Sequence, residues 1–179
     1  MTSSFSCLLI SAHIQNFIIN LYSYDMTTYS LDIIGLFIFI AGFIIGLGAV
    51  TVIDLHGFLG RKSPYWTLAT TRTHKVTKPL IWIGIGLTII GGSILYRQEA
   101  FTGIPLTHSL IAVVLILNGM FLSFKVSPFL IEREKQNRSD ELLPASWQRK
   151  ITSSFVVSFL GWWGGLLLFV VYVASRLAN

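Results

Sequence analysis

The chain has 179 residues, of which 53% are hydrophobic and only 12% are charged, and its mean hydropathy is +0.70. Soluble domains carry roughly 25% charged residues, so this composition excludes a water-soluble globule and a disordered chain. The single cysteine, Cys7, excludes an intrachain disulfide and a cysteine-based zinc or iron–sulfur site. The sequence therefore predicts an all-α integral membrane protein.

The N-terminal segment, residues 1–31, contains no lysine or arginine. His13, Asn16 and Asn20 share one helical face, and apolar residues recur at helical spacing on another. This pattern favours an amphipathic helix that lies in the membrane interface. Two alternatives stay open: a fifth span, or an extension that is disordered or lies upstream of a natural start at Met26.

Four runs without charged residues follow, within a transmembrane domain at residues 32–179. Each is close to the roughly 20 residues that a helix needs to cross the bilayer, where lipid offers no partner for an open backbone group. The predicted spans are Ile33–Ile53, Pro79–Tyr96, Leu106–Phe124 and Ile151–Ser175. They predict a four-helix transmembrane bundle.

The 13 lysine and arginine residues are divided unevenly between the two ends of this bundle. The loop after the first span holds five and the loop after the third holds six, which leaves only Arg97 and Arg176 for the other end. The positive-inside rule therefore predicts a multi-pass protein of the cytoplasmic (inner) membrane with both termini outside. Because the basic loops also account for the net charge of +5, no nucleic-acid partner is expected.

Small residues mark the faces on which the helices are expected to meet. Gly42 and Gly46 lie four residues apart in the first span, as do Gly161 and Gly165 in the fourth, and such pairs let helix backbones approach closely. Asn118 is an amide deep in the third span. It is predicted to hydrogen-bond to a neighbouring helix, or alternatively to line a site.

Asp32 and His108 form the first candidate site, because each begins a span at the outer end. Their similar depth would let them face one another across the bundle. The simpler interpretation is that each caps a helix in the wet headgroup layer. The alternative is an outer-leaflet site in which His108 binds a metal or a haem iron.

A second group of ionisable residues lies at the inner end. Asp54, His56 and His74 have the donor atoms of a metal site, although this spacing is weak evidence. Arg72 and Lys75 would contact an anionic headgroup or propionate. The simplest interpretation is a positive-inside anchor in which Asp54 pairs with one of the bases.

Three short stretches carry a family resemblance. They are Asp-Ile-Ile at 32–34 ahead of Ala41-Gly42, the basic turn Arg72–Lys75 ahead of Pro79, and Leu-Thr-His-Ser-Leu at 106–110. With four spans and outer termini, they resemble the HemJ-type membrane protoporphyrinogen oxidases and the broader CopD-like membrane proteins. The resemblance implies a haem b with His108 as its axial ligand. Asp32 stands where the family has its first-span histidine, which excludes a bis-histidine haem.

Two functions follow from these patterns. Since few polar residues converge, the first is a non-catalytic subunit or an assembly or scaffold component of a membrane complex, with the bilayer and other membrane proteins or further copies as partners. The alternative is a haem- or porphyrin-binding redox protein with His108 as axial ligand. Whether the chain is an enzyme stays open. A small transporter is disfavoured because only Asn118 is polar at mid-membrane.

Overall fold

The computed structural model describes residues 2–60, 63–138 and 141–178, and every regular element in these ranges is a helix. The elements are α1 (Thr2–Gly60), α2 (Pro64–Leu95), α3 (Gly103–Phe121), the π-helical turn η1 (Leu122–Val126), α4 (Ser127–Lys135) and α5 (Ala145–Leu177). Four stretches are long and apolar enough to cross a membrane: Thr28–Gly60, Pro64–Leu95, Gly103–Lys135 and Ala145–Arg176. The prediction of an all-helical chain with four such helices is confirmed.

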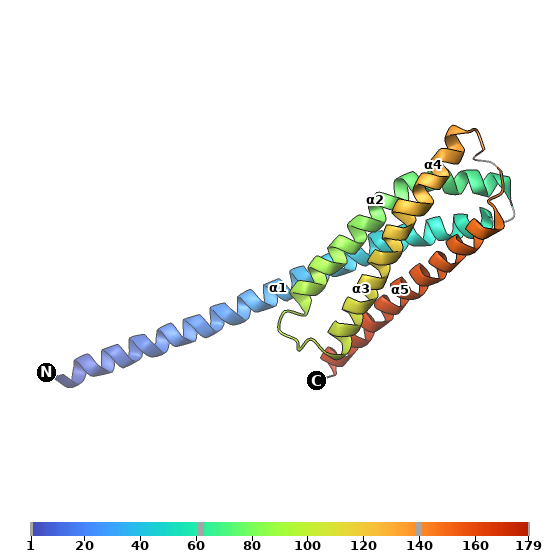
Figure 1. Cartoon of the computed structure of the whole chain (residues 1–179). Helices are drawn as coiled ribbons and strands as arrows, with labels where there is room; N and C mark the ends of the chain where they lie inside the picture. Colours follow the sequence, from blue (N-terminus) through green and yellow to red (C-terminus); the bar gives the residue numbers. More distant parts are fainter. Residues whose placement is uncertain (1, 61–62, 139–140, 179) are drawn as a thin grey trace.

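The bundle has two ends of different composition (Figure 1). We name the end with the α2–α3 loop and the C-terminus of α5 the tail end. The opposite end, with the α1–α2 and α4–α5 connections, holds most of the lysine and arginine residues and is named the basic end. All four long helices run between these two ends, so a residue's depth follows from its place along its helix.

Helix α1 crosses the boundary that the sequence predicts at residue 31 without a break. No glycine or proline lies between Thr2 and Ile34, so nothing in this segment interrupts helical hydrogen bonding. The N-terminal segment is therefore continuous with the first span instead of forming a separate element. Figure 1 shows this part of α1 extending away from the tail end of the bundle.

The other long helices extend past the apolar runs at the basic end. Helix α2 begins at Pro64 and continues through Pro79. The third helix passes through η1 into α4 and reaches Lys135, although Pro128 lacks an N–H for the helical ladder. The wider π turn directly before Pro128 lets the chain continue in the same direction. Hydropathy thus locates the apolar part of each helix but not its polar extension.

Glycines bring α1 and α2 into direct backbone contact. A Cβ at Gly42 would lie 2.6 Å from the backbone nitrogen of Thr88, and a Cβ at Gly84 would collide with the Cα of Gly46. The predicted Gly42–Gly46 face therefore packs against α2. In α5, the predicted glycines meet side chains instead: Gly161 packs on Leu115.

The core lies where the four long helices meet around Trp162, which is only 2% exposed. Phe43 packs edge-on against this indole, with ring centroids 5.7 Å apart. Gly46 and Gly165 leave room for these two large rings, because a Cβ at Gly46 would overlap Trp162 and one at Gly165 would lie 3.2 Å from Phe43. Helix α5 thus contacts both α1 and α3, whereas α2 and α3 touch only sparsely.

Asn118 ties α3 to α5 in the middle of this bundle. Its amide nitrogen donates to the carbonyl oxygen of Ser154 (3.0 Å) and to the hydroxyl of Ser158 (2.9 Å). The Ser154 hydroxyl donates to the Asn118 carbonyl oxygen at 2.7 Å. The amide thus hydrogen-bonds to a neighbouring helix, which is the first of its two predicted roles.

We expect Gly84→Ala to destabilise the protein by about 1–3 kcal/mol, because the added methyl must push α1 and α2 apart. Thermal unfolding in detergent, followed by tryptophan fluorescence, measures the loss. Gly86→Ala is the matched control two residues further along α2, where a Cβ meets nothing within 4 Å. Equal stability of the two variants would contradict the backbone contact.

Candidate functional site

Asp32 and His108 make their hydrogen bonds to different residues. The guanidinium of Arg97, just after α2, donates to the Asp32 carboxylate and to the Thr28 carbonyl oxygen at 3.1 Å. Asp32 therefore ties α1 to the α2–α3 loop at the tail end. This ion pair engages the carboxylate of the first candidate site.

His108 is held between α2 and α5 by both of its ring nitrogens. Nε2 lies 2.8 Å from the Gly165 carbonyl oxygen, and Nδ1 lies 2.9 Å from the Tyr96 hydroxyl. Because a carbonyl only accepts hydrogen bonds, Nε2 carries the proton and donates. With the proton on Nε2, Nδ1 can only accept, so the Tyr96 hydroxyl donates to it.

An aromatic and ionic group surrounds this histidine at the tail end. The Tyr96 ring stacks on the His108 ring and meets Tyr172 edge-on at 5.0 Å. The Tyr172 hydroxyl donates to Glu99 at 3.3 Å, and Glu99 also pairs with Arg176. The polar side chains that border His108 are thus already joined to one another.

A cavity of about 470 Å³ opens beside this group, between α2 and α3. We name it the tail-end cavity. Phe39, Phe43 and Trp162 line its inner wall, and Tyr96 and His108 lie at its polar border. It exists because α2 packs on α1 while α3 packs on α5, which leaves the two middle helices apart.

The residues of this cavity do not fit a haem iron as they are arranged. An axial histidine ligand needs a nitrogen lone pair directed at the metal. In His108, Nε2 is a donor to Gly165 and the Nδ1 lone pair accepts from Tyr96. Iron ligation would break one of these part-buried hydrogen bonds, at a cost of about 0.5–1.5 kcal/mol.

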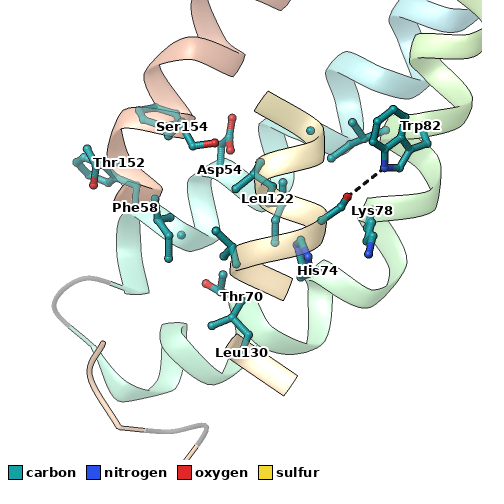
Figure 2. Close-up of a pocket in the computed structure, with 18 residues that line it drawn as sticks. Asp54, Phe58, Thr70, His74, Lys78, Trp82, Leu122, Leu130, Thr152 and Ser154 are labelled. Atoms are coloured by element: carbon teal, nitrogen blue, oxygen red, sulfur yellow. Dashed lines mark hydrogen bonds between the residues drawn. The ribbon is translucent and has the colours of Figure 1, made fainter. Parts of the chain in front are cut away.

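A second, smaller cavity of about 70 Å³ lies towards the basic end, and we name it the basic-end cavity. Asp54 of α1 and His74 and Lys78 of α2 line it (Figure 2). Trp82 borders it as well and donates its indole N–H to the Ser123 hydroxyl at 3.2 Å. Asp54 Oδ2 has no hydrogen-bond partner among the described residues, so its predicted pairing with a base is not seen in that part of the chain.

The other predicted residues of the inner end lie outside this cavity. His56 faces the Trp66 ring at 5.3 Å, and its Nδ1 has no partner among the residues described. Arg72 is exposed, and Lys75 donates to Glu134 of α4 at 3.0 Å. Within residues 2–60, 63–138 and 141–178, no three His, Cys, Asp or Glu side chains gather as metal ligands, so the predicted Asp54, His56 and His74 site is not formed.

Comparison with protein-family models, curated proteins and solved structures finds no match for this chain. The resemblance to HemJ-type and CopD-like proteins therefore stays a prediction. The site has to be interpreted from its own contacts.

The sequence does not predict the partners of His108 or of Asp32. The sequence places Tyr96 at the end of a span and Arg97 in the second loop, and the structure shows that each makes a side-chain contact with a different helix. The sequence does contain a signal for the Arg97–Asp32 pair, because the two residues carry opposite charges at the same predicted depth. Nothing in the sequence placed Gly165 opposite His108.

We expect His108 to be the neutral tautomer with its proton on Nε2. Nitrogen NMR of isotope-labelled histidine, in protein reconstituted in lipid, distinguishes this form from the Nδ1 tautomer and from the cation. In Tyr96→Phe, Nδ1 loses its donor and its resonance should move, whereas Tyr65→Phe, at the basic end, is the control. A proton on Nδ1 in the unaltered protein would contradict the network.

Proposed function

We propose that this chain is a non-catalytic membrane protein that holds a hydrophobic, ring-bearing molecule of the tetrapyrrole class in the tail-end cavity. The observation that carries the proposal is a cavity of about 470 Å³ whose aromatic walls open between α2 and α3. Small-molecule sites commonly measure about 300–1,000 Å³ and are lined mainly by apolar and aromatic side chains. Planar rings stack favourably on such walls.

The absence of catalysis in this proposal rests on the state of the polar groups. Catalysis needs a nucleophile, base or ligand that is free to act on the bound molecule. His108, Asp32 and Glu99 are each engaged by a partner within the bundle. Their contacts favour a role in holding the helices together. The shape and apolar walls of the tail-end cavity would then supply the binding.

A metal-free porphyrin agrees better with these contacts than haem b does, because His108 has no free lone pair. Membership of a membrane complex stays a prediction alongside this proposal. A porphyrin-binding chain would deliver or retain its ligand for partner subunits without chemistry of its own.

We further propose that the basic end faces the cytoplasm of an inner membrane and that the tail end faces outwards. The unequal distribution of lysine and arginine supports this orientation. The tail-end cavity would then open towards the outer leaflet.

Protoporphyrin IX should bind saturably to the purified protein in lipid nanodiscs, as measured by porphyrin emission and anisotropy against empty nanodiscs. Ala112 lines the cavity, so Ala112→Phe should weaken binding about tenfold or more, which corresponds to about 1.4 kcal/mol. Val114→Phe is the matched control, because Val114 is exposed on the same helix and does not line the cavity.

Equal signals from the protein, both variants and empty nanodiscs would reject the proposed ligand class. Haem b serves as the second probe. A Soret band typical of histidine ligation that disappears in His108→Ala would replace the metal-free proposal with the haem alternative.

A fusion at the C-terminus tests the orientation. Alkaline phosphatase fused after residue 179 should be active in a bacterial host, and green fluorescent protein at the same place should be dark. Fusions placed in the 136–144 connection should give the opposite pair of results. Fluorescence of the C-terminal fusion would reverse the proposed orientation.

A further inference from the structure

The basic-end cavity is lined by all four long helices. Asp54 and Gly57 come from α1, His74 from α2, Ser123 from η1 and Ser154 from α5. Every long helix therefore contributes to its wall, and the cavity lies between the helices and is partly open. Figure 2 shows Asp54, His74 and Lys78 around it.

Only three titratable groups line this cavity among the described residues. Asp54 is the one from α1, and His74 and Lys78 are the two from α2. The α3–η1–α4 helix and α5 contribute hydroxyl, backbone and apolar groups, such as those of Ser123, Ser154 and Leu122. One carboxyl, one imidazole and one ammonium group are therefore the complete set of ionisable groups in its wall.

Two atoms of this set are buried without partners. Asp54 Oδ2 and His74 Nε2 are each covered from solvent and make no hydrogen bond within the described chain. Lys78 forms no ion pair with any described residue either. This differs from the tail end, where Asp32, Glu99 and His108 are all engaged. Buried polar atoms left in this state call for an explanation.

The volume and the charged groups of the basic-end cavity limit what it could bind. A volume of about 70 Å³ exceeds the roughly 10–15 Å³ that one water needs, but it is far below the size of an organic ligand site. A metal cation is disfavoured, because the ammonium group of Lys78 repels it and no three-ligand group is present among the described residues. Carboxyl and imidazole groups inside membrane helices are typical of proton-binding positions.

We propose that the basic-end cavity is a proton-binding site in which Asp54 takes up and releases the proton, while the neighbouring Lys78 and His74 set its affinity. In the unprotonated state the wall of the cavity holds a carboxylate together with the ammonium group of Lys78. In the protonated state the Asp54 carboxyl becomes a hydrogen-bond donor. The site is separate from the tail-end cavity, so it does not depend on the ligand proposed there.

A route for the proton leads towards the basic end. A smaller cavity of about 20 Å³ shares Gly57, Thr70, Leu130 and Ile151 with the basic-end cavity. Its wall also includes Gln148, near the start of α5. Polar side chains thus continue from the basic-end cavity towards the loops, whereas the aromatic core closes the path in the other direction.

The first test uses the unaltered protein with a hydrophobic carbodiimide, which reacts with protonated carboxyl groups inside membranes. Peptide mass spectrometry of protein in lipid vesicles should find the label on Asp54, and the labelled fraction should fall as pH rises. Asp32 should stay unlabelled because its carboxylate is paired with Arg97. No label on Asp54 at any pH, or a labelled fraction independent of pH, would overturn the proposal.

The second test follows the carbonyl stretch of the protonated carboxyl by infrared spectroscopy as a function of pH. This band should be absent in Asp54→Asn. In Lys78→Met, loss of the nearby positive charge favours the neutral carboxyl, so the titration midpoint should rise by about one pH unit or more. The matched control is Lys75→Met, one turn away and paired with Glu134, which should leave the midpoint unchanged.

Two results of the infrared titration would count against the site. A midpoint that does not respond to Lys78→Met would remove the role of Lys78. A band that persists in Asp54→Asn would assign the proton to another carboxyl. If a variant fails to fold, the carbodiimide result on the unaltered chain still decides.

Discussion

The close contact between α1 and α2 determines where everything else in the bundle lies. In lipid, helices gain little from burying apolar side chains against each other, so association depends on close packing and on interhelical hydrogen bonds. Gly42, Gly46 and Gly84 supply the close packing by removing the side chains that would keep the two backbones apart. Helix α3 has no comparable contact with α2 and is held to α5 by Asn118 instead. Two pairs of helices result, and the space between α2 and α3 is the consequence.

The candidate residues at the two ends of the bundle differ in whether their polar atoms have partners. At the tail end, Tyr96 and Gly165 hold His108, and Arg97 holds Asp32, so each ionisable group has a fixed partner. Such pairing holds the two side chains in place and leaves them less free to react with a bound molecule. At the basic end, Asp54 and His74 keep buried atoms without partners. Because an unpaired polar atom is costly in a membrane interior, the second arrangement is the one that calls for a function.

The sequence is sufficient to predict the helices, but not to predict which residues of different helices contact one another. Runs of apolar residues predict spans because length and hydropathy are properties of a single segment, and Gly42 and Gly46 predict a contact face for the same reason. The pairing of His108 with Tyr96 and Gly165 depends on the register between three helices, which no single segment contains. Asp54 illustrates the same limit, because the sequence does not show that its Oδ2 atom is buried without a hydrogen-bond partner among the described residues.

The two cavities share no lining residue among those described, and along α2 they are separated by apolar side chains. Ile85 of α2 borders the tail-end cavity, whereas Ile81, one turn away, borders the basic-end cavity. A ligand in the tail-end cavity therefore does not touch Asp54. Any coupling between the two sites has to pass through a shift of the helices that line both cavities. The contact of Gly84 with α1 resists such a shift, so the geometry favours two independent sites in one bundle.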